Sequence, residues 1–175
     1  MMSENEETQK GELFLRLALE ANRQVRENHE RLDAKVNNII AADAAAITVL
    51  LGISYFVLEK NAFPSGQLRL AQLTVLFVGI ALFSFSMIIG VYTYLPKSFR
   101  FVRPMDLIRE LHHVGKTYGF VVRKTAGTIS DAVDYNLDVL NRKANLLKYM
   151  FAFTVVGFCF VAIAFVPFLW YISQQ

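Results

Sequence analysis

The stretch YMFAFTVVGFCFVAIAFVPFLWYI, residues 149–172, contains neither Lys nor Arg and is apolar almost throughout. A helix over these 24 residues rises about 36 Å, which is enough to cross the roughly 30 Å of hydrocarbon in a bilayer. Two similar runs precede it, at residues 39–58 and 71–95, and neither contains Lys or Arg. A soluble buried helix of such length and composition would be unusual. We therefore predict an all-α integral membrane protein with three transmembrane helices.

Basic residues are distributed unevenly around these spans. The connection between the first two spans has only Lys60 and Arg69, and the tail 173–175 has none. The connection between the second and third spans carries Lys97, Arg100, Arg103, Arg109, Lys116, Arg123, Lys124, Arg142, Lys143 and Lys148. Since short cytoplasmic loops collect Lys and Arg, we expect residues 1–38 and 96–148 to be cytoplasmic. Residues 59–70 then form an outer turn, and the C-terminal tail lies outside. The acidic N-terminus does not resemble a signal peptide, so we expect the first span to act as its own insertion signal.

The two polar segments predict a cytoplasmic helical region, formed by the N-terminal helix and the segment between spans two and three. In residues 10–38, apolar side chains such as Phe14, Leu17 and Val25 recur at spacings of three and four, which indicates an amphipathic helix. It either packs on its own cytoplasmic partner or self-associates, and it can continue into the first span. Pro104 favours a short helix, and residues 128–131 (TISD) resemble a capping box. A last helix is expected to begin there and to continue into the third span.

No arrangement of residues in the sequence predicts catalysis. Gly115-Lys116-Thr117 resembles the end of a Walker A loop, but Glu110 stands where that loop needs glycine. His112 and His113 fall on different sides of a helix and have no Cys or acidic partner at metal-ligand spacing. The single cysteine, Cys159, is expected to be an apolar thiol. We therefore predict that the protein is not an enzyme and has no metal site, cofactor or nucleic-acid partner.

Asp43 is an acidic residue inside the first predicted span. A charged Asp at the bilayer centre costs on the order of 3 kcal/mol, so we expect Asp43 to face other helices or water. Lys148 stands at a similar depth at the start of the third span and is the expected partner. Two interpretations stay open, a structural ion pair and a pore or gate residue.

The basic face of the segment between the second and third spans also has two interpretations. It either fixes the topology and attracts anionic lipid, or it forms an anion site for a nucleotide, with Tyr118 and Phe120 available for stacking. The candidate residues for nucleotide binding are Arg100, Arg103, Arg109, His112, Lys116, Arg123 and Lys124.

The start of the first span resembles that of a known family. The stretch LDAKVNNII, residues 32–40, and the small residues that follow to Ala46 are similar to the opening of the transmembrane effectors of the Pycsar antiphage defence system, with Asp33 and Lys35 as motif residues. The outer turn, Leu95-Pro96 after the second span, the polar helical segment and the helix leading into the third span resemble the family's layout along nearly the whole chain. The family often has Asn in the first span, where this chain has Asp43.

The resemblance implies a function that composition alone does not indicate. A partner cyclase would make a cyclic pyrimidine nucleotide, cCMP or cUMP, upon phage infection. The effector would bind this nucleotide and impair the bacterial inner membrane, which causes abortive infection. Because three spans are too few to enclose a water-filled path, we expect a homo-oligomer. The alternative is a small membrane scaffold or accessory channel subunit that binds a protein partner through its long helices.

Overall fold

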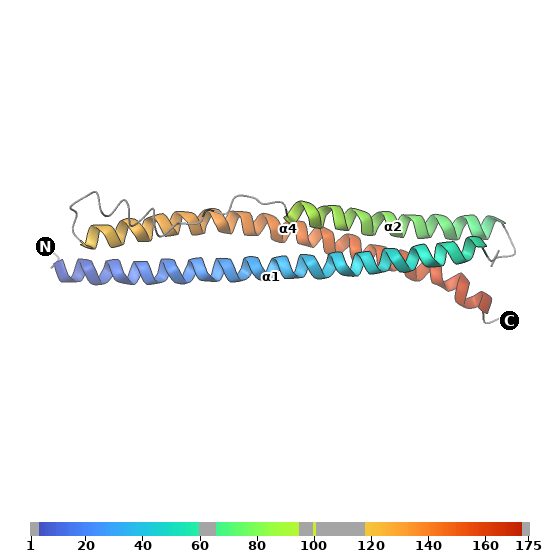
Figure 1. Ribbon diagram of the computed structural model, residues 1–175, viewed down its shortest axis with the longest axis horizontal. Coiled ribbons are helices and arrows are strands. Elements are labelled where there is room, and N and C mark those ends of the chain that lie inside the picture. The colour runs from blue at the N-terminus through green and yellow to red at the C-terminus, as the bar shows by residue number, and fades with distance from the viewer. Residues whose placement is uncertain (1–3, 60–65, 95–99, 101–117, 173–175) are drawn as a thin grey trace. The chain divides into compact units, whose positions relative to one another are not determined.

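The computed structural model describes residues 4–59, 66–94, 100 and 118–172 (Figure 1). Apart from Arg100, these residues form three helices, α1 over Glu4–Glu59, α2 over Gly66–Tyr94 and α4 over Tyr118–Ile172. Each of the three is long and apolar enough to cross a bilayer. The predicted all-α architecture with three spans is confirmed at this level, and the chain is a multi-pass membrane protein.

Two of the helices are much longer than a membrane span. α1 has 56 residues and α4 has 55, and both pass from a polar stretch into an apolar one without a break. The predicted continuity of the N-terminal helix with the first span, and of the last polar helix with the third span, is therefore confirmed.

The described residues fall into two compact units. Residues 4–32, 100 and 118–143 form the first, which we call the polar unit, and residues 33–59, 66–94 and 144–172 form the second, the membrane unit. α1 and α4 contribute to both units, whereas α2 belongs to the membrane unit alone.

Burial along the helices follows a period of seven residues. The buried positions of α4 include Val122, Ile129, Asn136, Lys143, Met150, Gly157 and Ala164. Those of α2 are Gln72, Leu76, Gly79, Phe83, Ser86, Gly90 and Thr93, which alternate in steps of four and three. This is the spacing of coiled-coil seams, in which two positions of every seven face the neighbouring helices.

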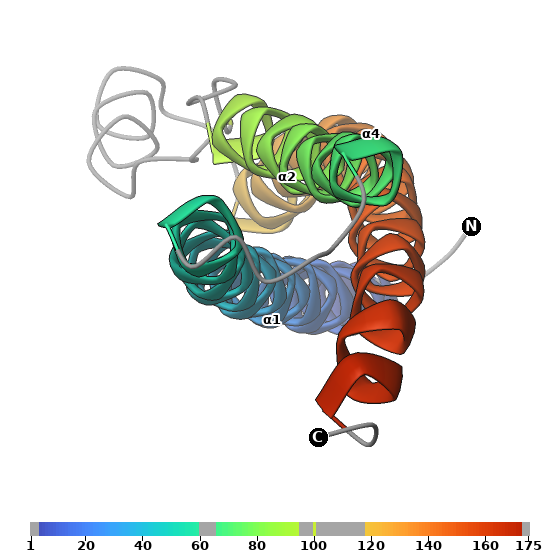
Figure 2. The ribbon, with the colours of Figure 1, turned by 90° about the vertical axis from the view of Figure 1, so that its right-hand side faces the viewer.

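The helices α1, α2 and α4 all contribute to the membrane unit (Figure 2), and their side chains pack tightly at its centre. Phe83 of α2 is fully buried and packs with Leu50 of α1 and Ala164 of α4. A Cβ built on Gly157 would lie 3.0 Å from the Phe83 ring, and one on Gly90 would lie 2.9 Å from both Ile40 and Met150. Small residues at such places let membrane helices approach closely, which increases their van der Waals contact where lipid supplies no hydrophobic driving force.

The polar unit has a smaller core between α1 and α4. Val25 packs against Ile129 and Val133, and these three side chains are buried. Between α2 and α4, the main-chain N–H of Arg100 donates to Asn136 Oδ1 at 3.1 Å. Asn136 Nδ2 donates back to the Arg100 carbonyl at 3.2 Å. This reciprocal pair fixes the backbone at Arg100 against α4.

The helix start predicted at residues 128–131 is wrong. α4 is already helical at Tyr118, and the Thr128 hydroxyl donates to the Lys124 carbonyl within the helix, at 3.0 Å, instead of capping an N-terminus. The buried side chains of Val122 and Ala126 favour the earlier turns, because their apolar surface is removed from water only when that stretch is helical against α1. The short helix predicted at Pro104 lies outside the described residues.

Candidate functional site

Asp43 is completely buried in the membrane unit. It lies on α1 midway between Val36 and Leu50, which are also buried, at the same seven-residue spacing. A carboxylate moved out of water without compensation is unstable by several kcal/mol, so the polar groups around Asp43 decide whether this packing is stable.

The carboxylate of Asp43 is held by hydroxyl groups from α2 and α4. Thr154 Oγ1 donates to Asp43 Oδ1 at 2.9 Å and also lies 3.2 Å from Oδ2. Ser86 Oγ lies 2.9 Å from Thr154 Oγ1, with either atom able to donate, and both hydroxyls lie 3.1 Å from the Met150 carbonyl oxygen. Asp43, Ser86, Thr154 and the Met150 carbonyl, which we call the polar cluster, therefore connect all three helices.

The polar cluster has fewer hydrogen-bond donors than acceptors. Each hydroxyl has one hydrogen, so Thr154 divides its donation between the carboxylate and the Met150 carbonyl, while Ser86 supplies the second hydrogen. Within the described residues, no Lys, Arg or His lies within ion-pair distance of Asp43. A proton or a small cation among these oxygen atoms would change their charge balance, and a water molecule would add hydrogen-bond donors. Each would change the packing free energy of all three helices.

The predicted partner of Asp43 was wrong. Lys148 stands two residues before the buried Met150, which places it about 200° around the helix, and its side chain is exposed. Asp43 is level with Thr154, six residues or about 9 Å along α4 from Lys148, so neither the predicted depth of Lys148 nor its predicted direction was correct. Sequence reasoning also missed Ser86 and Thr154; the available signal was the seven-residue repeat that puts Ser86 on one face with Gln72 and Thr93.

Gln72 is a second buried polar side chain in the membrane unit. Its Nε2 donates to the Ala164 carbonyl at 3.1 Å, whereas its Oε1 has no partner among the described residues. An unsatisfied buried acceptor costs about 1–3 kcal/mol, so this end of the α2–α4 contact is less completely satisfied than the polar cluster.

The structure brings few of the predicted nucleotide-binding residues together. Four of them, Arg103, Arg109, His112 and Lys116, lie outside the described residues. The Arg100 guanidinium lies over the Tyr135 ring, 4.5 Å from its centroid. Tyr135 is twelve residues from Arg123 on α4, or about 18 Å along the helix, so Arg100 does not share a site with Arg123 and Lys124.

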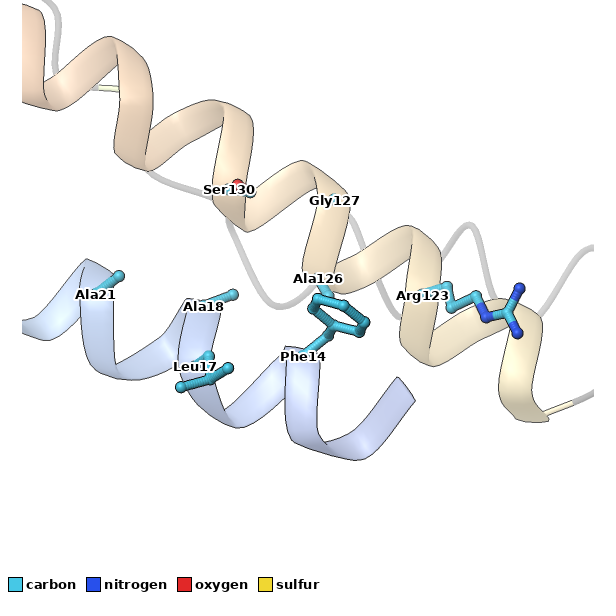
Figure 3. Close-up of a pocket in the computed structure, with 8 residues that line it drawn as sticks. All are labelled: Phe14, Leu17, Ala18, Ala21, Arg123, Ala126, Gly127 and Ser130. Carbon is cyan, nitrogen blue, oxygen red and sulfur yellow. The ribbon is translucent and has the colours of Figure 1, made fainter. Parts of the chain in front are cut away.

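Arg123 instead lines a groove between α1 and α4 in the polar unit, with a volume of about 420 Å³ (Figure 3). The ring of Phe14 lies against Ala126, and the Arg123 side chain extends along α4 at one end of the groove. Its other lining residues are small or apolar: Leu17, Ala18, Ala21, Gly127 and Ser130. An exposed aromatic ring, a cationic group and a hydroxyl therefore line one cavity of small-molecule size.

The two motif residues of the first span lie at the beginning of the membrane unit. The Asp33 carbonyl is 3.5 Å from the Tyr94 hydroxyl at the end of α2, and Lys35 lines a different groove with Lys148. Within the described residues, no three His, Cys, Asp or Glu side chains gather as ligands for a metal ion.

The fold and these sites define a multi-pass membrane protein with a buried polar cluster between its spans. Comparisons with models of protein families, with curated proteins and with solved structures found no match for the chain.

Proposed function

We propose that the protein is an antiphage effector that binds a cyclic pyrimidine nucleotide, cCMP or cUMP, and responds by impairing the bacterial inner membrane. The observation that carries the proposal is the continuity of α1 and α4. Both helices line the groove that contains Phe14 and Arg123, and both carry residues of the polar cluster. The similarity of residues 32–46 to the Pycsar effectors supplies the nucleotide and the biological setting.

In this proposal the polar unit is cytoplasmic and the C-terminus lies outside. The excess of basic residues after the second span supports this orientation, because Lys and Arg are retained on the cytoplasmic side during insertion. A cytoplasmic groove is accessible to a nucleotide made inside the cell.

The groove offers the kinds of contact that a cyclic nucleotide needs. The base can stack on the exposed Phe14 ring, and the guanidinium of Arg123 can bind the single negative charge of the cyclic phosphate. Ser130 offers a hydroxyl at the same groove. A nucleotide that binds better to one arrangement of α1 and α4 shifts the population toward that arrangement.

The polar cluster supports a two-state response in the membrane. Its hydrogen bonds hold α1, α2 and α4 together through one buried carboxylate, so a small displacement of α1 or α4 exposes Asp43 or leaves it without a donor. One protomer has a packed centre at Phe83 and Leu50. We therefore propose that the membrane is impaired by a homo-oligomer in which rearranged spans of several copies meet.

Calorimetric titration of the purified full-length chain in detergent tests nucleotide binding, with cCMP, cUMP, cAMP and cGMP as ligands. We expect saturable binding of one pyrimidine nucleotide, and Arg123→Ala should weaken it at least about tenfold through loss of a charge-assisted hydrogen bond. Arg142→Ala is the matched control, because it removes an exposed arginine from the same helix outside the groove. Absence of binding to all four ligands by an intact oligomer contradicts the proposal.

Vesicles with an entrapped dye test the response of the membrane. The nucleotide should release the dye from vesicles that contain the wild-type chain. Asp43→Asn should still bind the nucleotide saturably and release less dye, because its amide keeps the shape of the side chain but removes the charge. Release that does not depend on the nucleotide contradicts a gated effector.

A membrane scaffold or accessory channel subunit is the second candidate function. The observation that favours it is the exposure of Leu13, Phe14 and Leu17 on α1 of the polar unit, at 59%, 63% and 59%. Neighbouring apolar side chains of this kind fit a protein partner. Co-expression with a pyrimidine cyclase separates the two functions, since an effector arrests growth when the nucleotide is made and a scaffold does not.

A further inference from the structure

A second groove lies in the membrane unit and has a volume of about 430 Å³. α1 contributes Lys35, Asn38 and Ile39, and α4 contributes Leu147, Lys148 and Phe151. None of these six lining residues is acidic. The groove is separate from the polar cluster, whose side chains are buried, whereas Lys35, Asn38, Lys148 and Phe151 are exposed.

Polar and apolar side chains are segregated along this groove. In the membrane unit α1 and α4 run parallel, because Asp43 contacts Thr154 and Lys35 shares a groove with Lys148 at nearly the same sequence offset. The two ammonium groups therefore start from the same level. Ile39 is four residues after Lys35, and Phe151 is three after Lys148, so both apolar side chains begin about one turn deeper.

This division coincides with the limits of the apolar runs. The first run begins at Ile39 and the third at Tyr149, so Lys35, Asn38 and Lys148 precede the apolar sequence on their helices. Phe151 is 59% exposed inside the third run, where the surroundings are acyl chains. The groove thus begins at the level of lipid headgroups and continues into the hydrocarbon.

Among the described residues, no acidic side chain compensates the charge of Lys35 or Lys148. Neither Lys35 nor Lys148 forms an ion pair within the part of the chain that the structure describes. In the polar unit, by contrast, Arg23 and Arg26 each bind a glutamate one turn along the helix, at 2.9 and 3.3 Å. Two uncompensated cations beside an amide and above an apolar floor match a ligand with an anionic head and a hydrocarbon tail.

We propose that the groove formed by Lys35, Asn38, Ile39, Leu147, Lys148 and Phe151 is a binding site for one anionic phospholipid. Its phosphodiester lies between the two ammonium groups, with the Asn38 amide as a further hydrogen-bond donor. An acyl chain covers Ile39 and Phe151, one turn deeper. A soluble phosphate would use the lysines but leave the apolar part of the groove unoccupied, so the lipid is the occupant that accounts for both parts.

The site is tested by titrating phosphatidylglycerol into the full-length chain in a neutral detergent, with native mass spectrometry to count bound lipids per protomer. We expect one tightly bound lipid. Lys35→Gln with Lys148→Gln should weaken its binding about thirtyfold, which is about fivefold for each lysine near a lipid surface. The matched control is Arg31→Gln with Arg142→Gln, which removes the same charge from the same two helices outside the groove. The control should stay within about twofold of the wild type.

The other ligands decide between this site and its rivals. Phosphatidylcholine should bind at least about tenfold more weakly than phosphatidylglycerol, and glycerol phosphate and inorganic phosphate should not displace the bound lipid. Equal loss of binding in both double variants overturns the proposal, because it would show diffuse attraction to basic helices. Displacement by inorganic phosphate also overturns it, since the apolar part of the groove would then contribute nothing. All of these lysines and arginines are exposed, so the variants retain the packed core.

Discussion

The two units use the same seven-residue spacing with different chemistry. In the polar unit an apolar cluster of Val25, Ile129 and Val133 forms the core, the buried Asn136 and Lys143 follow Ile129 by one and two seven-residue steps, and Leu13 and Phe14 remain exposed. In the membrane unit fully buried apolar side chains such as Phe83 are joined by Asp43 and Ser86, which are just as completely buried. Polar groups thus occupy the centre of the more apolar unit.

This contrast between the buried side chains of the two units follows from their surroundings, which are water for the polar unit and lipid for the membrane unit. In water, burying apolar surface is favourable by roughly 25 cal/mol per Å², so a few aliphatic contacts are enough to hold two helices together. Lipid is as apolar as the side chains themselves, so close packing at small residues and hydrogen bonds between helices determine which surfaces meet. Gly90, Gly157 and the polar cluster supply these two effects in the membrane unit.

The largest expected effect tests whether water surrounds the polar unit and lipid surrounds the membrane unit. Leu19 and Leu51 are exposed to similar extents on α1, at 50% and 54%, one in the polar unit and one in the first span. Leu51→Lys should oppose insertion by about 3 kcal/mol, whereas Leu19→Lys should change stability by no more than about 0.5 kcal/mol. The measurement is the fraction of each variant that resists alkaline extraction from membranes. Equal extraction of both variants would contradict the comparison.

The next effect concerns the hydrophobic core of the polar unit. Ile129→Ala removes buried aliphatic groups against Val25 and should lower the free energy of unfolding by about 2.5 kcal/mol. Leu137→Ala is the control, because Leu137 is 39% exposed on the same helix and should cost less than half as much. Thermal unfolding in detergent, followed through the helix signal in circular dichroism, measures both losses. Similar costs for the two variants would mean that this core contributes little.

Close packing in the membrane unit predicts a somewhat smaller loss. Gly90→Leu would force side-chain atoms into Ile40 and Met150, which already lie 2.9 Å from a Cβ built at this position, and should cost about 2 kcal/mol. Gly52→Leu is the matched control in the first span, since nothing lies within 4 Å of its Cβ position. Denaturation in mixed micelles compares the two variants. A destabilised Gly52 variant beside a stable Gly90 variant would reverse the assignment of the packed face.

The smallest effect isolates one hydroxyl of the polar cluster. Thr154→Val keeps the shape of the side chain but removes the donor to Asp43, and it should cost about 1 kcal/mol, as single hydrogen bonds between membrane helices do. Thr48→Val is the control, because the exposed Thr48 hydroxyl bonds only to the Ala44 carbonyl of its own helix. Thr154→Ser keeps the hydroxyl, so its free energy of unfolding should stay within a few tenths of a kcal/mol of the wild-type value. Equal losses of stability in the Thr48 and Thr154 variants would show that the hydrogen bonds of the polar cluster contribute no more than a hydroxyl bonded within its own helix.

The sequence was a better guide to elements than to their contacts. Hydropathy located the three spans, and the absence of a breaker predicted that α1 and α4 are continuous. The capping-box pattern at residues 128–131 failed because a local signal competed with the packing of Val122 and Ala126. The compact units change at residues 32/33 and 143/144, about one and a half turns before the apolar runs begin, and no change in composition marks that point.

By itself, the sequence determined that this chain has three apolar helices of spanning length, two of them extended by long polar stretches. Each helix satisfies its own backbone hydrogen bonds, so its existence depends on nearby residues alone. Only the tertiary structure decided that Asp43 meets Thr154 and not Lys148, and that Lys148 shares a groove with Lys35. Such contacts depend on how each helix is rotated, and close packing at positions such as Gly90 sets that rotation through residues far apart in the chain.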